Sequence, residues 1–266
     1  MSLLLNKQED YNMYGFRYLK ATYYISIDIC LPDNRWSSYK SNILLNARYT
    51  ALQENYKFSL EQKKNILLNG EKPSQPIDDI MMRLGCALYP VLLTVSPQGK
   101  IKRVENFDKI KIRRTAESNK ILNEMLSVPV QKYIALSERQ MENEKTFLQA
   151  LLRDTFVRLY FLDETEDELL FPVYNLNGTG TVLYAQCRKN SIDEHTVNYD
   201  WEDDDSGAYC RLVYKYSSLK DIISIKASIS AGNIGGKEYK KEINICLNKE
   251  GYEIKKSNEF VSFFID

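Results

Sequence analysis

The sequence predicts an α+β protein: a mostly antiparallel, curved, half-barrel-like sheet with a helical middle segment packed against it. Apolar and polar residues alternate at both ends of the chain, as they do in strands. Apolar residues in the middle recur at helical spacing, and a hairpin signal at 88–106 stands between the helices. With 266 residues the chain can bury a large core. We therefore expect one domain over 1–266, with N-terminal strands (1–70), a helix–hairpin–helix middle (71–162) and a C-terminal antiparallel meander (169–266).

The N-terminal region begins with a long predicted strand at 14–31. The alternating residues are Phe16, Tyr18, Ala21, Tyr23, Ile25, Ile27 and Ile29. A second strand is predicted at 36–45. The segment 46–70 allows a helix or a further hairpin, and we favour strands at 56–60 and 64–68.

The hairpin is the clearest local signal in the chain. An alternating strand leads into a turn that has Pro97 at its second position and Gly99 at its end, and a charged, alternating strand returns from it. Asn106 then has the side chain and the position of a helix N-cap. We expect this hairpin to join the N-terminal strands, the helical middle and the C-terminal meander.

Three helical segments are predicted around the hairpin. The helix at 76–88 has one apolar stripe, and Ser74 stands where it can cap that helix. The second helix covers 107–126 and is expected to end before Val128-Pro129. The segment 130–161 has the longest helical pattern, with a possible break near 135–137.

From residue 169 onward the sequence predicts strands only. The predicted strands are 169–174, 179–189, 194–201, 208–216, 222–230, 237–248 and 252–264. Short turns favour antiparallel neighbours, and Glu250-Gly251 is expected to be one of these turns. The segment around Gly251 also resembles the hairpin around Gly99, which we interpret as shared hairpin chemistry.

Composition excludes several classes of partner and compartment. The chain carries 36 basic and 36 acidic residues, so no net charge favours nucleic acid or an anionic membrane. No apolar run approaches a membrane span, and the N-terminal residues lack a signal-peptide pattern. The cysteines are Cys30, Cys86, Cys187, Cys210 and Cys246. Their odd count and wide spacing indicate buried, reduced thiols, and we expect a cytoplasmic protein.

Catalytic and metal-binding patterns are not found in the sequence. The single histidine, His195, would need Cys187 or Cys210 as a nucleophile. The acidic run at 200–205 has the spacing of a calcium loop but has Asp205 where that loop needs glycine. Gly232 begins a glycine-rich segment that is followed by a strand pattern, not by a phosphate-binding helix. We therefore predict no enzyme activity, no cofactor and no metal.

Two small groups of residues are candidates for binding a partner. Trp201 lies among acids that include Asp203 and Asp204, and an exposed tryptophan in this setting suits a basic partner. The alternative is a tryptophan buried in the sheet. Arg113 and Arg114 lie at the centre of a basic segment and could contact an acidic partner. The alternative is a solvated helix face.

The middle of the chain also resembles known proteins. The matching residues are Leu88, Tyr89, Pro90, Gly99, Ile101, Asn106 and Ile110. Over about 80–160 the chain resembles a group of uncharacterised bacterial proteins that are β-rich with a helical middle, and this resemblance implies no activity. The order of elements also looks like the half-barrel of periplasmic lipoprotein carriers, which implies an apolar ligand cavity.

Two non-enzymatic functions follow as hypotheses. The first is a cytosolic protein that binds another protein, as an adaptor, chaperone or immunity-type protein does. The alternative is a carrier of a small apolar ligand or lipid on the concave face of the sheet, which predicts a cavity of some hundreds of Å³. The sequence sets neither the identity of the partner nor the oligomeric state.

Overall fold

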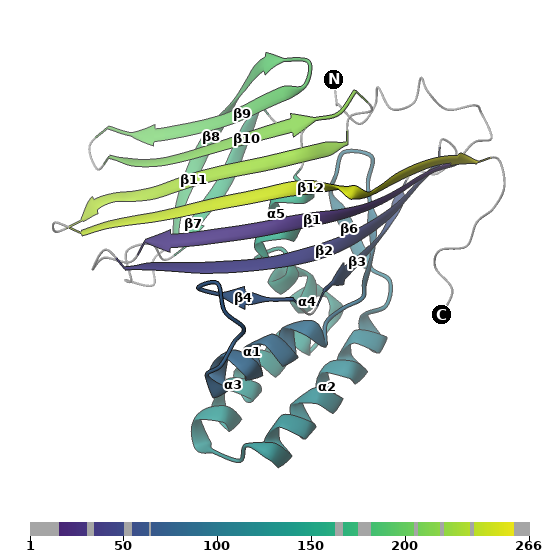
Figure 1. Cartoon of the computed structure of the whole chain (residues 1–266), viewed down its shortest axis with the longest axis vertical. Coiled ribbons are helices and arrows are strands. Elements are labelled where there is room, and N and C mark those ends of the chain that lie inside the picture. Colours follow the sequence, from purple (N-terminus) through teal and green to yellow (C-terminus); the bar gives the residue numbers. More distant parts are fainter. Residues whose placement is uncertain are drawn as a thin grey trace.

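The protein is an open antiparallel sheet with a set of helices on one side (Figure 1). The computed structural model describes residues 16–30, 35–50, 55–63, 65–162, 167–174, 182–204, 207–218, 221–234 and 237–257. The strands are β1 (Phe16–Cys30), β2 (Trp36–Thr50), β3 (Tyr56–Gln62), β4 (Leu67–Leu68), β5 (Val91–Val95), β6 (Ile101–Val104), β7 (Glu168–Tyr174), β8 (Val182–Asp193), β9 (Thr196–Asp203), β10 (Ala208–Tyr216), β11 (Ile222–Ile234) and β12 (Lys237–Ser257). The prediction of an α+β protein with a mostly antiparallel sheet is confirmed.

Strands from the two ends of the sequence meet in the middle of the sheet. The strand order is β6-β5-β3-β2-β1-β12-β11-β10-β9-β8-β7, and β4 pairs with β2. β1 pairs with β2 from Phe16 to Cys30 without interruption, and its other edge pairs with β12. The β5–β6 hairpin therefore lies at one edge of the sheet, next to β3, and not at its centre.

The helices that the structure describes all come from the segment between β4 and β7. They are α1 (Pro76–Cys86), α2 (Phe107–Glu124), α3 (Val128–Glu138), the short 3₁₀ helix η2 (Arg139–Met141), α4 (Glu144–Leu151) and α5 (Thr155–Tyr160). Figure 1 shows α5 behind β12 and β1, with α1, α2 and α3 grouped beyond β4. The helical middle thus contributes one part that packs on the sheet and one part that extends from it.

Side-chain caps explain where the later helices begin. The Ser127 hydroxyl accepts a hydrogen bond from the Val130 backbone N–H, and Pro129 stands in the first turn of α3, where no donor is needed. Val128-Pro129, which was predicted to follow the end of a helix, therefore also begins the next one. Asn143 and Thr146 form a reciprocal capping box at the start of α4. The break in the long helical pattern accordingly falls after Glu138, later than predicted.

Aromatic side chains fill the space between the sheet and α5. Tyr23 of β1 lies 5.7 Å from Phe156 and 5.3 Å from Tyr160, measured between ring centroids. The Tyr23 hydroxyl donates to the Ile222 carbonyl at 2.8 Å, and the Tyr214 hydroxyl donates to the Leu159 carbonyl at 3.0 Å. Tyr23 and Tyr214, which the sequence favours for strand surfaces, are thus core residues, and each of their buried hydroxyls has a carbonyl acceptor.

A bulge replaces the turn that was expected at Glu250-Gly251. Lys20 pairs with Glu253 and Thr22 pairs with Asn248, so four residues of β12 stand opposite Ala21. β12 runs through this irregularity as one strand, and the two predicted C-terminal strands are one. The similarity to the Gly99 hairpin is therefore local sequence only. The predicted strand at 64–68 is reduced to Leu67–Leu68 where the structure describes it, and Lys64 lies outside the described residues.

The helices that the structure describes are too short or too polar to cross a lipid bilayer.

Candidate functional site

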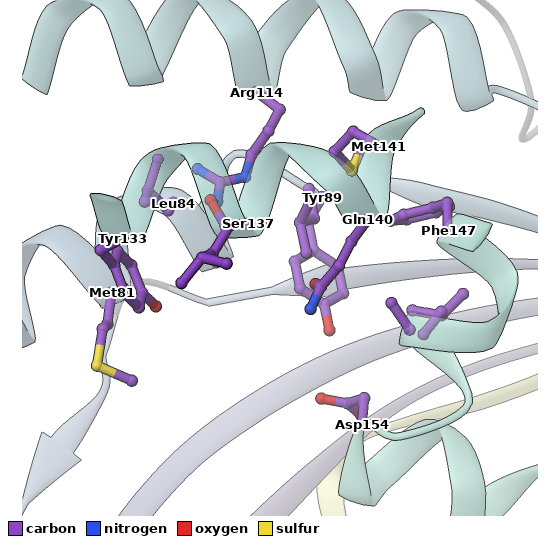
Figure 2. A pocket seen from close by; sticks show the side chains of 15 residues that line it. Met81, Leu84, Tyr89, Arg114, Tyr133, Ser137, Gln140, Met141, Phe147 and Asp154 are labelled. Carbon is purple, nitrogen blue, oxygen red and sulfur yellow. The ribbon is translucent and has the colours of Figure 1, made fainter. Parts of the chain in front are cut away.

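A pocket of about 360 Å³ opens between the helices (Figure 2). Its walls come from α1, the connection between α1 and β5, α2, α3, η2, α4 and the segment that enters α5. The lining residues are Met81, Leu84, Gly85, Leu88, Tyr89, Arg114, Tyr133, Leu136, Ser137, Gln140, Met141, Phe147, Ala150, Leu151 and Asp154. Most of these side chains are apolar and a few are polar, which is the usual composition of a small-molecule site.

The pocket lies between two separate clusters of buried apolar side chains. Ile80 and Leu84 of α1 pack with Ile121 and Ile134 in a small cluster that holds α1, α2 and α3 together. Phe147 belongs to the large core that joins α4 and α5 to the sheet. Leu84 and Phe147 both line the pocket, so its opposite walls belong to different clusters. The pocket thus occupies a space between two separately packed clusters.

Gly85 keeps part of this space open. It stands near the end of α1 and lines the pocket, and a Cβ atom placed on it would meet no heavy atom within 4 Å. A glycine inside a helix costs about 1 kcal/mol relative to alanine. No packing contact explains this glycine, whereas an open pocket does.

Arg114 is the buried cation of the pocket. Its side chain extends from α2 toward Ser137 of α3 and is 6% exposed (Figure 2). The Nη2 atom donates to the Ser137 hydroxyl at 2.9 Å, and that hydroxyl donates to the Ile134 carbonyl at 2.8 Å. Burial lowers the pKa of Arg114 from its ordinary value. The Nη1 atom has no hydrogen-bond partner among the described residues.

Asp154 is the acidic group of the pocket, on the side toward the sheet. Its Oδ1 atom accepts from the Val157 backbone N–H at 2.9 Å, which caps α5. The side chain is exposed, but the surface that it exposes lines the pocket. Protein atoms therefore surround it on the other sides of the pocket. This enclosure raises the pKa of Asp154, against the opposing effects of two backbone hydrogen bonds and of Lys241 on β12.

The two neighbouring arginines singled out by the sequence have different environments. Arg113 is half-buried and binds the connection between α1 and β5: Nε donates to the Ala87 carbonyl at 3.3 Å, and Nη2 donates to the carbonyls of Leu88 and Pro90 at 3.1 and 3.0 Å. Arg114 is directed into the protein. The expectation of a solvated basic face is therefore wrong at these two positions, because the helix turns by about 100° per residue and both guanidinium groups contact other elements.

The acidic candidates lie on the sheet, far from α2. Trp201 is half-buried and packs against the main core, beside Cys210 of β10. Because side chains alternate along a strand, its neighbours in sequence point to the other face. Asp203 is half-buried at the end of β9, and Asp204 is exposed in the turn that follows. Figure 1 shows β9 and α2 at opposite ends of the molecule, so the five candidates do not form one surface. Partner binding by either group stays a prediction.

His195 is not brought to a cysteine. It is exposed in the turn between β8 and β9, where its backbone N–H donates to Asp193 Oδ1 at 2.7 Å. Cys187 lies six residues before Asp193 along β8, or about 20 Å at about 3.3 Å per residue. Cys210 pairs with Trp201, five residues beyond the start of β9. The hypothesis of a histidine–cysteine pair is wrong.

The five cysteines are free thiols, but not all of them are buried. Cys30, Cys187 and Cys210 are buried, Cys86 is half-buried and Cys246 is exposed. The expectation of five buried thiols is therefore wrong for two of them.

Sequence reasoning missed the pocket. Its residues come from seven segments of the chain, and no local pattern states where two apolar clusters will separate. Gly85, inside the apolar stripe of α1, was the one available signal, since it interrupts a row of large side chains.

No protein-family model and no curated protein matches the chain. A solved structure described as "Lipid-protein interactions in lipovitellin" is similar, with a TM-score of 0.35 and 10% sequence identity over 91% of this chain and 25% of that chain. The chain therefore spans a quarter of that protein, and a likeness at this TM-score supports no inference about fold or function. The resemblances to β-rich bacterial proteins and to half-barrel carriers remain expectations.

Proposed function

We propose that the protein binds a small, mainly apolar molecule in the pocket between its helices. The pocket carries this proposal: it has about 360 Å³ of space, apolar walls from two separate clusters and a few polar groups. Sites of this size and composition bury most of the surface of a small ligand. At about 30 Å³ for each water-sized group, the space holds about 12 such groups.

The ligand site lies away from the sheet face that a half-barrel carrier would use. Where α5 covers the sheet, Tyr23, Phe156 and Tyr160 pack against one another and leave the ligand no room. We therefore propose that a carrier function would use the helical pocket and not the face of the sheet. The sheet supports this through the aromatic side chains that pack α5 against β1, and Asp154 caps that helix.

The mouth of the pocket has apolar side chains in contact with water. Met81 is 51% exposed and Leu136 is 60% exposed, and both line the pocket. Exposed apolar groups around a cavity are typical of ligand entry sites. They support binding and release of a molecule through this opening.

The test is calorimetric titration of the protein with octan-1-ol, a neutral eight-carbon probe. Binding is expected with a negative heat-capacity change, because apolar surface is buried. Gly85→Leu should abolish this binding by placing a side chain in the pocket, whereas Gly85→Ala is the matched control and should retain it. Equal binding by wild type and Gly85→Leu would contradict the proposal.

The hypothesis of a protein partner remains a separate prediction. A cytosolic partner that binds Trp201 or Asp204 would be recovered with the native protein and lost with Asp204→Lys. The structure offers this hypothesis no pocket or continuous surface that joins the candidate residues.

A further inference from the structure

The pocket has a buried positive charge that the protein does not neutralise directly. Arg114 is 6% exposed, and only its Nη2 atom has a described hydrogen bond, to Ser137. Within the described residues no carboxylate lies within ion-pair distance of its guanidinium; Glu138 and Glu117 act on it only at longer range. A buried charge without a close counter-ion is expensive, because desolvation removes its stabilisation by water.

Arg83 of α1 shows what direct pairing with acids looks like in this protein, although its Nη2 atom also has no hydrogen-bond partner among the described residues. Arg83 of α1 donates from Nε to Glu117 Oε1 at 2.6 Å and from Nη1 to Glu124 Oε2 at 2.5 Å. Glu138, the acid that acts most strongly on Arg114, instead accepts from the Ser118 hydroxyl at 2.8 Å. The helices thus provide paired acids for the arginine outside the pocket and none for the arginine that lines it.

Asp154 is a less suitable partner for a positively charged ligand than Arg114 is for a negatively charged one. Its carboxylate already caps α5 through the Val157 backbone N–H, and Lys241 of β12 lies near enough to act on it. Asp154 has a structural role and a cationic neighbour, whereas Nη1 of Arg114 has neither a partner nor contact with solvent. The pocket therefore favours an anion near Arg114 over a cation near Asp154.

We propose that the ligand is a medium-chain carboxylate of about eight to ten carbons, whose carboxylate binds Arg114 and whose chain lies along Leu84, Tyr89 and Phe147. This inference rests on the proposed function, because it names the class of ligand for the same pocket. Ser137 positions the guanidinium: its own hydroxyl proton is donated to the Ile134 carbonyl, so the carboxylate accepts from Arg114 alone. Nη1 is the donor proposed for the ligand carboxylate, because it has no other hydrogen-bond partner among the described residues.

The length of the chain follows from the space available. An eight-carbon carboxylate has ten non-hydrogen atoms, and the pocket holds about 12 water-sized groups. A chain of about 16 carbons would exceed this space and would extend past Met81 and Leu136 into water. Its affinity should therefore stop rising with added carbons, in contrast to a carrier with an open channel.

The test compares three eight-carbon probes that differ only in the polar end: octanoate, octan-1-ol and octylamine. The wild-type protein is expected to bind octanoate at least about 10-fold more tightly than octan-1-ol, since a hydrogen bond to a charged group is worth more than one to a neutral group. Octylamine should bind most weakly. Equal affinities for octanoate and octan-1-ol, or a preference for octylamine, would overturn the inference.

Variants assign the preference to one residue. Arg114→Met should remove the preference for octanoate and leave binding of octan-1-ol within about 3-fold, because its shape is kept and its charge is lost. Arg114→Lys should retain part of the preference. Arg103→Met is the control, since Arg103 is an exposed arginine of β6 that does not line the pocket, and it should not weaken octanoate binding. An Arg114→Met variant that keeps the preference would place the carboxylate elsewhere and sink the assignment.

Two readouts separate this inference from the proposed function. If octan-1-ol binds and Gly85→Leu blocks it, but octanoate has no advantage, the pocket binds ligands and only the carboxylate inference fails. If no probe binds, both fail.

A measurement on the wild type alone protects the test against a misfolded variant. Octanoate labelled with ¹³C at its carboxyl should show a lowered carboxyl pKa when bound, because the guanidinium favours the anion. An unchanged or raised pKa counts against the inference.

Discussion

Replacing Arg113 by methionine should destabilise the protein, although the residue lies in a sequence that suggests a solvated face. The side chain donates three hydrogen bonds to the connection between α1 and β5, at carbonyls of Ala87, Leu88 and Pro90. Hydrogen bonds from a charged group contribute about 1.5–3 kcal/mol each. The bond to Ala87 is long, at 3.3 Å, so we count two bonds at the lower value because Arg113 is only half-buried. The expected loss is about 3 kcal/mol.

Arg114→Met is the matched comparison, one residue away on the same helix. It removes a buried charge that has one described hydrogen bond and no close acid, and replaces it with an apolar side chain of similar length. Such replacements are often neutral or stabilising. The free energy of unfolding should therefore change by less than about 1 kcal/mol, well below the loss for Arg113→Met.

Urea unfolding, followed by far-ultraviolet circular dichroism, measures both variants. The comparison uses midpoints at equal slope, because a change in slope would indicate a different unfolded or intermediate state. If Arg113→Met unfolds at the same urea concentration as wild type, the three hydrogen bonds do not hold the connection. If Arg114→Met loses more stability than Arg113→Met, the view of Arg114 as a ligand-binding residue with little structural contribution is refuted.

Three further results are expected. Gly85→Ala should raise the free energy of unfolding by about 0.5–1 kcal/mol in a urea titration, because its Cβ meets open space and alanine favours helix; a loss of stability would mean that the pocket wall is closed. In the wild type, stability should fall as pH rises above about 3.8, because the raised pKa of Asp154 means that the folded state holds the proton more tightly than the unfolded state does. Asp154→Asn should make this fall smaller, since asparagine does not ionise. Unfolding midpoints that change with pH alike in both proteins would contradict this. Iodoacetamide should label Cys246 well before Cys187, as mass spectrometry of digested protein can show, because only the former is exposed; equal rates would contradict the described burial.

Local patterns in the sequence identified most of the strands and helices. β10 follows clean period-2 alternation, β1 follows it with a change of phase between Tyr18 and Ala21, and α1 has an apolar stripe, so each element could be recognised without its neighbours. These elements bury one face, and that face is visible in the spacing of apolar residues. The turn at Pro97 and Gly99 was recognised for the same reason, since turn chemistry is local.

Features that depend on distant partners could not be recognised. The sequence around Gly251 is typical of a turn, but β12 pairs with β1 on both sides of this residue. The chain therefore forms a bulge here and not a turn. Arg113 and Arg114 look equivalent in sequence, yet helix geometry sends them to different neighbours. The pocket depends on where two clusters separate, which is decided by the packing of α1 against α2 and of α4 against the sheet.

The central place of β1 sets an order of events during synthesis. One edge of β1 is covered by β2 soon after both leave the ribosome, but its other partner, β12, begins more than 200 residues later. At about 5–20 residues per second this takes about 10–40 s. During that time β1 offers a long row of unpaired backbone groups, which can pair with another chain. A chain that stops before β12 should therefore aggregate. Synthesis of this protein should depend on chaperones that cover the unpaired edge of β1 until β12 has been made.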